Sequence, residues 1–246
     1  GIPNNPDSDG DGMWDGFEDY YGLNLRDNTD ATNNNDTDCL TNLEEFELSR
    51  DGRYWPAPVA PVLDNRELWL TQATNPTVDD TDGDGMSDSD EERFSLLIRT
   101  PDADIDQDLD DIPNGWEVLY AEDQECPVVY NSSVGMNPND QTDRDYDFDS
   151  DGLSNYEEYS TIDIFVEGLS TSPLNWDTDN DLMSDGWEWN YYTVYFNSAH
   201  FNPVDNPADA LGDLDIPNPD GLNNLGEHDN ETDPYDPDTD DDGMDD

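Results

Sequence analysis

The sequence contains no lysine, and apart from two histidines its only basic residues are seven arginines. Against them stand 65 aspartates and glutamates, which give a formal net charge of −58 at pH 7. A chain this acidic offers no basic face to nucleic acid or to an anionic membrane surface, so neither is an expected partner. The chain also repels itself, and its compact state is therefore expected to need bound cations or concentrated salt.

Hydrophobic residues are scarce as well. They make up 32% of the 246 residues, and the mean hydropathy of −1.00 lies near the range of disordered chains. No apolar run approaches the roughly 20 residues that a membrane-spanning helix needs. The aromatic residues, 11% of the chain, gather beside the acidic stretches. This arrangement predicts many small cores instead of one large one.

Histidine and cysteine are too few for the common catalytic patterns. The chain has only His200 and His228, and no serine or cysteine stands in a recognisable nucleophile motif. With 65 carboxylates, a pair at glycosidase distance would arise by accident, so we do not expect an enzyme. The two cysteines, Cys39 and Cys126, lack metal-ligand spacing. They can form a disulfide outside the cell or remain two buried thiols, and the sequence leaves both open.

What the sequence has in abundance is one acidic pattern, which is clearest at Asp7–Glu18. The stretch DSDGDGMWDGFE places oxygen-bearing side chains at positions 1, 3, 5, 9 and 12 around a glycine at position 6. This is the spacing by which a twelve-residue loop wraps a calcium ion, with a backbone carbonyl at position 7 and both oxygens of the closing glutamate. The glycine, Gly12, lets the chain turn through a positive φ.

The pattern recurs in register, and its eight copies are named loops 1 to 8: residues 7–18, 34–45, 80–91, 106–117, 147–158, 177–188, 216–227, and an incomplete copy from 238. This recurrence, with a hydrophobic residue at every position 7, favours binding of several Ca²⁺ ions over solvated runs of charge. The predicted side-chain ligands are Asp7, Asp9, Asp11, Asp15 and Glu18 in loop 1; Asn34, Asp36, Asp38, Asn42 and Glu45 in loop 2; Asp80, Asp82, Asp84, Asp88 and Glu91 in loop 3; Asp106, Asp108, Asp110, Asn114 and Glu117 in loop 4; Asp147, Asp149, Asp151, Asn155 and Glu158 in loop 5; Asp177, Asp179, Asp181, Asp185 and Glu188 in loop 6; Asn218, Asp220, Asn224 and Glu227 in loop 7; and Asp238, Asp240, Asp242 and Asp246 in loop 8. The predicted carbonyl ligands are those of Met13, Leu40, Met86, Ile112, Leu153, Met183, Leu222 and Met244.

Some copies depart from the pattern. Cys39 replaces the glycine of loop 2, which weakens that site, while Asp111 in loop 4 tolerates the left-handed conformation better than most residues. Leu182 replaces the glycine of loop 6, at a predicted cost of about 1–2 kcal/mol if the conformation is kept. Loop 7 lacks an acid at position 1. Upstream of loop 5, Asp143 and Asp145 extend the acidic ladder, where a second ion could bind.

Both ends of the sequence fall inside the pattern. Asn4 and Asp7 fit positions 9 and 12 of a loop whose front half is missing, and Asp246 fits position 9 of loop 8. We therefore expect either a slice of a longer tandem chain or neighbouring subunits that complete each other's loops.

Short helices are expected behind the loops. After loop 1, Phe17, Tyr20 and Tyr21 can share one helix side before Gly22 ends it, and residues 44–49 and 115–123 read similarly. The stretch 187–198 is too aromatic and β-branched to assign. The predicted fold class is irregular, with low secondary structure: a string of calcium-binding loops, each followed by a short α-helix, with extended connectors and little β-structure. The expected loop segments are residues 1–50, 78–120 and 141–246, and the connectors are 51–77, which is rich in proline and aromatic residues, and 121–140.

These units, which read DxDxDG(M/L)x(D/N)xxE in GMxDGWE and GLTNxEE flavours, resemble thrombospondin type 3 and related bacterial and archaeal calcium-binding repeats of secreted and surface proteins. The resemblance covers the chain apart from residues 51–77, 121–140 and 190–212. It implies that the acidic side chains chelate several calcium ions along a compact acidic core, and that the modules act as calcium-rigidified spacers or stalks.

The predicted function is that of an extracellular, calcium-stabilised structural repeat protein that self-associates as a segment or subunit of a surface filament, fibre or stalk. One alternative is an adhesin or carbohydrate-binding module, and another is a non-catalytic spacer of a larger secreted protein. The residues expected to contact glycans in the first alternative are Trp55, Trp69, Trp176, Trp189 and the stretch Tyr191–Phe196.

Two further expectations concern single side chains. Trp116 and Trp187, each one residue before a closing glutamate, are expected to fill the small core behind their loops and not to stack on sugars. The sequons at Asn35, Asn131 and Asn230 mark surface glycosylation sites if the source has that machinery.

Overall fold

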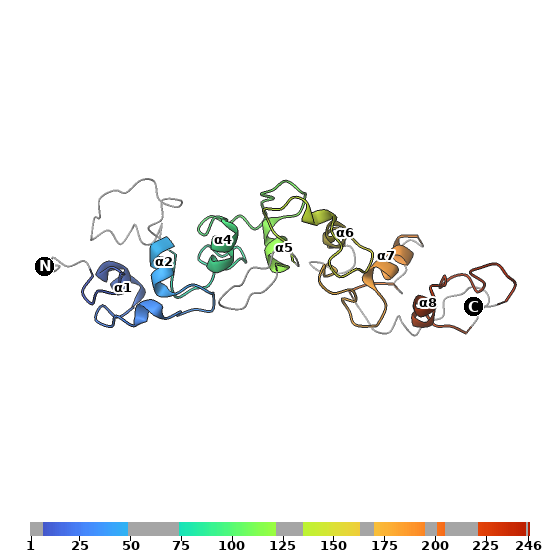
Figure 1. Cartoon of the computed structure of the whole chain (residues 1–246), viewed down its shortest axis with the longest axis horizontal. Helices are drawn as coiled ribbons and strands as arrows, with labels where there is room; N and C mark the ends of the chain where they lie inside the picture. Colours follow the sequence, from blue (N-terminus) through green and yellow to red (C-terminus); the bar gives the residue numbers. More distant parts are fainter. Residues whose placement is uncertain are drawn as a thin grey trace. The chain divides into compact units, whose positions relative to one another are not determined.

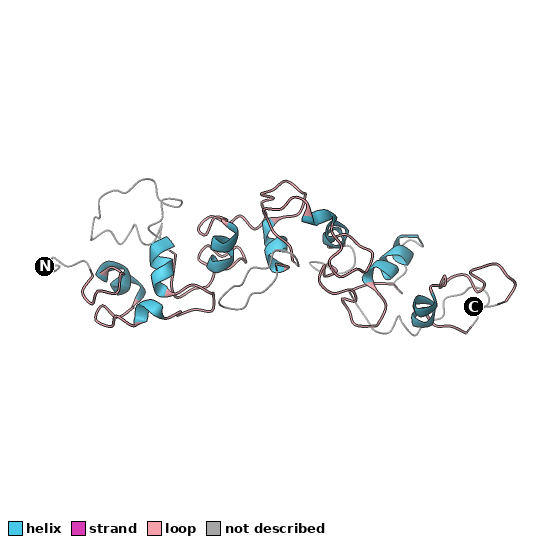
Figure 2. Ribbon diagram, in the orientation of Figure 1, coloured by secondary structure: helices cyan, strands magenta, loops and turns pink. Residues whose placement is uncertain are grey.

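The computed structural model describes residues 7–48, 74–121, 135–162, 170–194, 201–204, 221–244 and 246. Within these ranges the chain forms short helices separated by loops, and no strand occurs in them (Figure 2). The predicted fold class is therefore confirmed: secondary structure is low, and loops alternate with short helices.

Seven α-helices lie in the described ranges (Figure 1): α1 (Asp15–Tyr21), α2 (Asn42–Leu48), α4 (Asp88–Phe94), α5 (Asn114–Leu119), α6 (Asn155–Ser160), α7 (Asp185–Val194) and α8 (Asn224–Asn230). Each of them begins at position 9 of a loop, so the closing glutamate lies in its first turn. A negative charge there interacts favourably with the helix dipole. Two 3-10 helices, η1 (Asp30–Thr32) and η2 (Asp143–Asp145), precede loops 2 and 5.

The helix ends follow from the local sequence. The side chains of Ser87, Ser154 and Asn223 accept hydrogen bonds from backbone N–H groups of the first turns of α4, α6 and α8. Helix α1 ends at Gly22, whose φ of 77° is left-handed, as the sequence predicts. The stretch that the sequence left unassigned continues α7 as far as Val194.

Helices of six to ten residues are not stable alone, and small cores hold them. One core buries Met13, Phe17, Leu23, Ala31 and Phe46 against Trp14, Tyr21 and Leu43. A second buries Met86, Phe94, Leu96, Val118 and Ala121. Each core joins the residue at position 7 of a loop to side chains of the module that follows, as expected for a chain with several small cores.

The chain divides into two compact units. One comprises Gly1–Asp108, Pro113–Ser133 and Asn137–Asn139, and the other comprises Leu109–Ile112, Val134–Met136 and Asp140–Asp246. Cys39, in the first unit, is disulfide-bonded; Cys126, the only other cysteine of the sequence, lies outside the described residues. No helix in the described ranges is both long and apolar enough to cross a bilayer.

Candidate metal centres

The aspartate at position 1 organises the acidic loop. In loop 1, Asp7 accepts the N–H of Gly10 on Oδ1 at 2.6 Å and the N–H of Gly12 on Oδ2 at 3.2 Å. Asp11, at position 5, accepts the N–H of Met13 at 2.8 Å. The corresponding three bonds recur in loops 3, 5 and 6, at Asp80 and Asp84, Asp147 and Asp151, and Asp177 and Asp181. These bonds curl the backbone so that the acids at positions 1, 3 and 5 point inward.

Two residues of each regular loop are left-handed. Position 6 has the predicted positive φ, for example 105° at Gly12, and the two substituted residues keep it, with 76° at Asp111 and 81° at Leu182. Position 4 was not predicted to be left-handed. It has a positive φ at Gly10, Gly83, Leu109, Ser150, Asn180 and Asp241. Because these six positions hold five residue types, glycine content alone does not reveal the turn.

Leu182 makes the cost of the left-handed conformation testable. Its side chain is 58% exposed, so it gains little burial in return for the strain at its Cβ. We expect Leu182→Gly to stabilise the folded protein by about 1 kcal/mol, since relief of about 1–2 kcal/mol exceeds the entropic cost of glycine. Urea unfolding of both proteins under the same ionic conditions measures this difference in the free energy of unfolding. Leu174 is the control: it is 41% exposed and lacks a positive φ, so Leu174→Gly is expected to destabilise. A lower midpoint for Leu182→Gly would contradict the prediction.

Loop 2 is built differently. Its position 1 is Asn34, whose amide nitrogen donates to the carbonyl of Asp38, and an asparagine has only one side-chain oxygen with which to accept N–H groups. Neither Thr37 nor Cys39 is among the described residues with a positive φ. The disulfide at Cys39 therefore lies in the loop that lacks the regular backbone turn.

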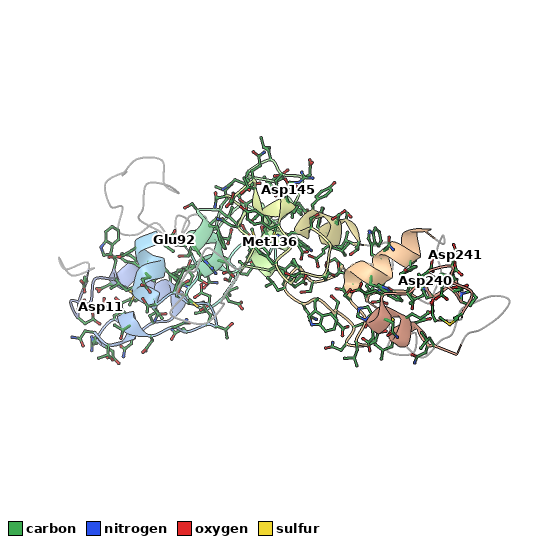
Figure 3. The ribbon with its side chains drawn as sticks, turned by 45° about the vertical axis from the view of Figure 1, so that its right-hand side comes forward. Asp11, Glu92, Met136, Asp145, Asp240 and Asp241 are labelled. Atoms are coloured by element: carbon green, nitrogen blue, oxygen red, sulfur yellow. The ribbon has the colours of Figure 1, made fainter. Side chains whose placement is uncertain are left out.

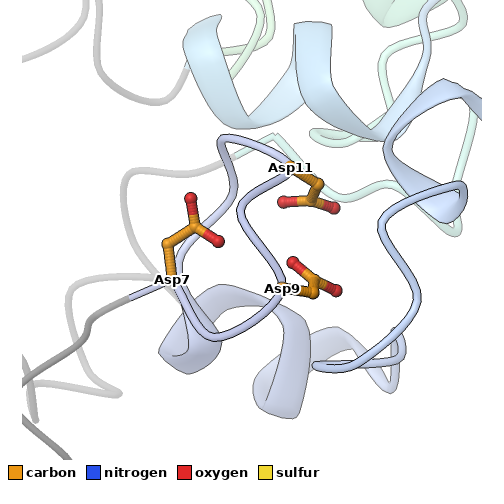
Figure 4. Close-up of side chains that lie close together, drawn as sticks. All are labelled: Asp7, Asp9 and Asp11. Atoms are coloured by element: carbon orange, nitrogen blue, oxygen red, sulfur yellow. The ribbon is translucent and has the colours of Figure 1, made fainter.

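The acids at positions 1, 3 and 5 come together. Asp7, Asp9 and Asp11 each offer a carboxylate oxygen, and these oxygens lie within 4.8 Å of one another; Figure 4 shows the carboxylates of Asp9 and Asp11 facing each other. Two further groups of this kind are Asp80, Asp82 and Asp84, and Asp106, Asp108 and Asp110. Both oxygens of Asp9 are buried without a hydrogen-bond donor among the described residues. Figure 3 draws the described side chains and labels Asp11 in loop 1, Asp240 and Asp241 in loop 8, and Glu92 and Asp145, which lie next to loops 3 and 5.

The closing glutamates are fully buried, which is unusual for a charged side chain. The exposed fraction is 0% for Glu18, Glu45, Glu91, Glu117, Glu158 and Glu188, and 1% for Glu227. In four of them, neither carboxylate oxygen accepts a hydrogen bond from any described residue: Glu18, Glu91, Glu158 and Glu188. Burying an unpaired carboxylate costs several kcal/mol, so these oxygens call for a cation.

The pKa values of the closing glutamates are raised, as expected for buried carboxyl groups that lack a compensating charge. Burial, followed by the charges of Asp11 and Asp9, raises the pKa of Glu18 to about 8. Burial likewise raises the pKa of Glu91 to about 9 and those of Glu158 and Glu188 to about 10, again with help from neighbouring aspartates. A calcium ion at these oxygens would remove the cause of the shift, because it compensates the buried charge.

The side chain at position 9 stabilises the loop through hydrogen bonds. It does so in two different ways, which define two kinds of module. In the first kind, an aspartate at position 9 accepts the backbone N–H of a serine or threonine at position 2. The four pairs are Ser8–Asp15, Thr81–Asp88, Thr178–Asp185 and Thr239–Asp246. In the first three pairs the aspartate also accepts the hydroxyl group of the serine or threonine. For Ser8 and Asp15, the bond from the backbone N–H and the bond from the hydroxyl are both 2.7 Å long. Because these hydrogen bonds occupy the carboxylate at position 9, it would contact a bound ion through a water molecule, as position 9 often does in loops of this kind.

In the second kind, an asparagine at position 9 donates its side-chain N–H to the backbone carbonyl of an aspartate twelve residues upstream. The pairs are Asn42–Asp30, Asn114–Asp102 and Asn155–Asp143, at 2.7–3.1 Å. Each of these aspartates lies four residues before position 1 of its loop. Of these three aspartates, Asp143 was predicted as part of an acidic ladder before loop 5, whereas Asp30 and Asp102 were not predicted as site residues.

Consecutive modules also meet at position 5. The Oδ1 atom of Asp84, in loop 3, accepts the N–H of Met86, and its Oδ2 atom accepts the N–H groups of Asp102 at 2.7 Å and Ala103 at 2.9 Å. The Oδ2 atom of Asp151, in loop 5, likewise accepts the N–H of Gly186 at 2.8 Å. A Cβ at Gly186 would lie 2.3 Å from the carbonyl oxygen of Asp151, so only glycine fits this contact.

The remaining predicted residues are less informative. In loop 7, Asn224 and Glu227 are buried and Gly221 has a positive φ, whereas Met244 in loop 8 is 68% exposed. At position 7, the side chains of Met13, Met86, Ile112, Leu153 and Met183 are buried. The predicted residues that lie outside the described ranges are Asn4, Trp55, Trp69, Cys126, Asn131, Phe196, His200, Asn218 and Asp220.

The tryptophans beside the closing glutamates pack inside the modules. Trp116 is 7% exposed and lies against Tyr120, with ring centroids 4.7 Å apart. Trp187 packs against Phe201 at 5.3 Å. Trp116 therefore has the expected core role, whereas Trp187 is only partly buried. Trp176 is 43% exposed.

No family model, no curated protein and no solved structure matches the chain. The class of site is therefore defined by its own geometry: repeated groups of carboxylates that could hold metal ions.

Proposed function

We propose that the chain is an extracellular structural repeat protein whose fold is held by calcium ions bound in the acidic loops. The observation that carries the proposal is the burial of closing glutamates such as Glu158 and Glu188, at 0% exposure, with no described hydrogen-bond donor to either oxygen. Such a carboxylate is tolerated only if a cation compensates it.

Calcium suits these loops better than other common metals. The offered ligands are carboxylate oxygens, which are hard ligands, and three loop acids plus a closing glutamate with two oxygens approach the six to eight that Ca²⁺ takes. Magnesium demands octahedral geometry and keeps several waters, so an all-protein cage suits it less. Because the ligands repel one another without the ion, binding free energy becomes folding free energy.

The extracellular setting and the structural role rest on different supports. The disulfide at Cys39 favours an oxidising compartment. The two small cores, which join loops 1 and 3 to the modules that follow them, favour a chain of nearest-neighbour modules. Such a chain suits a stalk, fibre or filament that associates with copies of itself. The relation to thrombospondin type 3 repeats is part of the same proposal.

The test is chelation. Circular dichroism and light scattering, with and without a calcium chelator, are measured at low and at high sodium chloride. We expect helical signal and compactness to disappear on chelation at both salt concentrations and to return with calcium but not with equimolar magnesium. Full retention of the fold in chelator at high salt would instead mean that screening suffices, and would overturn the proposal.

A further inference from the structure

A second group of acids lies beside the first in loop 1. Asp11, Glu18 and Asp30 each offer a carboxylate oxygen, and these oxygens lie within 4.8 Å of one another. Asp30 belongs to η1, outside loop 1 and four residues before loop 2. Loop 3 repeats the arrangement with Asp84, Glu91 and Asp102, where Asp102 stands four residues before loop 4.

In each group the aspartate before the next loop is buried, and one of its two carboxylate oxygens lacks a donor among the described residues. Asp30 is 8% exposed; its Oδ2 accepts the N–H of Asn24 at 2.7 Å, while its Oδ1 accepts from no described residue. Asp102 is 4% exposed, and its Oδ2 accepts the N–H of Leu97 at 3.1 Å while its Oδ1 is likewise without a donor in the described ranges. At position 5, Oδ2 of Asp11 is also buried without a described donor, whereas Oδ2 of Asp84 accepts the N–H groups of Asp102 and Ala103.

Position 5 belongs to both groups, because Asp11 also meets Asp7 and Asp9 within 4.8 Å. When ionised, the five acids of the two groups carry five negative charges, so one divalent cation leaves three uncompensated and a second leaves one; these acids are Asp7, Asp9, Asp11, Glu18 and Asp30. A single ion therefore does not account for the buried charge.

We propose that loops 1 and 3 each bind a second divalent cation, held by the aspartate at position 5, the closing glutamate and the aspartate that precedes the next loop. This inference rests on the proposed function, since it adds a site to loops already assigned to calcium. Oxygens 4.8 Å apart or closer can share one Ca²⁺, because ligands at 2.3–2.6 Å on opposite sides of the ion lie at most about 5 Å apart. Water supplies the remaining ligands.

This second ion ties one module to the next. The carbonyl of Asp30 accepts the side-chain N–H of Asn42, in loop 2, at 2.8 Å, and the carbonyl of Asp102 accepts that of Asn114, in loop 4, at 3.1 Å. The asparagine at position 9 of the second kind of module thus holds in place an aspartate that serves the loop before it. Asn42 and Asn114 are positioning residues in this arrangement.

The test counts ions bound to the full chain in calcium alone, by elemental analysis after equilibrium dialysis and by native mass spectrometry. We expect Asp30→Asn and Asp102→Asn each to lose one calcium ion, and the double variant to lose two. Matched controls in the same segments are Asp27→Asn and Asp104→Asn, which change the same charge at exposed residues and are expected to retain the wild-type number. The contact of Asp27 with Thr29 uses Oδ1, which asparagine retains.

A further variant separates this inference from the proposed function. Asp9→Asn alters only the first group of loop 1. Loss of an ion in Asp9→Asn, with the wild-type number in both Asp30→Asn and Asp102→Asn, would overturn the second site and leave the proposed function standing. A wild-type chain that binds no calcium would overturn both. Circular dichroism in saturating calcium accompanies each count, and if Asp30→Asn does not fold, Asp102→Asn and its control decide the question.

Discussion

Freed of calcium at low ionic strength, the protein is expected to be unfolded near pH 8 and to regain its compact state as the pH is lowered towards 4. Burial raises the pKa of Glu18 to about 8, and of Glu158 and Glu188 to about 10, from an ordinary value of 4.5. A carboxyl with a higher pKa in the folded state binds more protons when folded. Stability of the calcium-free protein therefore falls as the pH rises from about 4.5 to about 10.

Calcium reverses this dependence. Protons compete with the ion for the same carboxylate oxygens, so the loaded protein is expected to lose calcium and stability on acidification. Thermal unfolding followed by circular dichroism between pH 4 and pH 9 measures both curves, with the calcium-free sample dialysed against chelator and then against metal-free buffer. The two curves should slope in opposite directions and cross. A calcium-free protein that is more stable at pH 8 than at pH 5 would contradict the assignment of the buried glutamates.

Replacing a closing glutamate by glutamine is expected to have opposite effects with and without calcium. Glu158 is fully buried, and neither of its oxygens has a donor among the described residues. In Glu158→Gln a single amide oxygen replaces a charged group that can supply two ligands. Calcium affinity at loop 5 should fall at least about 100-fold, or about 2.8 kcal/mol. Without calcium, Glu158 must take up a proton before it can be buried, and glutamine removes this cost, so the calcium-free protein should become more stable.

The adjacent residue provides the matched control. Glu157 lies in the same helix, is exposed, and its side chain accepts the N–H of Ser154 in a capping box that glutamine can also make. Glu157→Gln should therefore bind calcium like the wild type. Calorimetric titration gives the affinities. The second comparison is the pH at which the calcium-free protein becomes compact, followed by circular dichroism, and this pH should be higher for Glu158→Gln than for the wild type. Equal affinities for the two variants would remove Glu158 from the site.

The sequence was sufficient for the features that depend on a fixed local spacing. Gly12 and Leu182 both have the positive φ predicted for position 6, and Asp7, Asp9 and Asp11 converge as their alternation requires. The end of α1 at Gly22 could be predicted for the same reason, since glycine reaches the left-handed region without a Cβ clash.

The features that escaped prediction depend on contacts outside the twelve positions. Asp30 and Asp102 join the acids of the preceding loop from turns of their own, and a single acidic residue in an acidic chain does not stand out. The two uses of position 9 were also missed, because aspartate and asparagine are interchangeable in a ligand pattern. They differ in what they can donate: Asn42 has an N–H for the carbonyl of Asp30, whereas Asp15 can only accept.

The acid group around Asp30 has a consequence for where a repeat can be cut. By motif, loop 1 and its helix end near Gly22, but Glu18 meets Asp30 beyond that point, and Phe46 of α2 closes the core on Met13. Adjacent repeats therefore share contacts, because both the acid group and the core of one repeat include residues of the next. The smallest fragment that contains one complete set of contacts runs through two motifs, residues 7–46, and boundaries drawn from the motif alone would divide it.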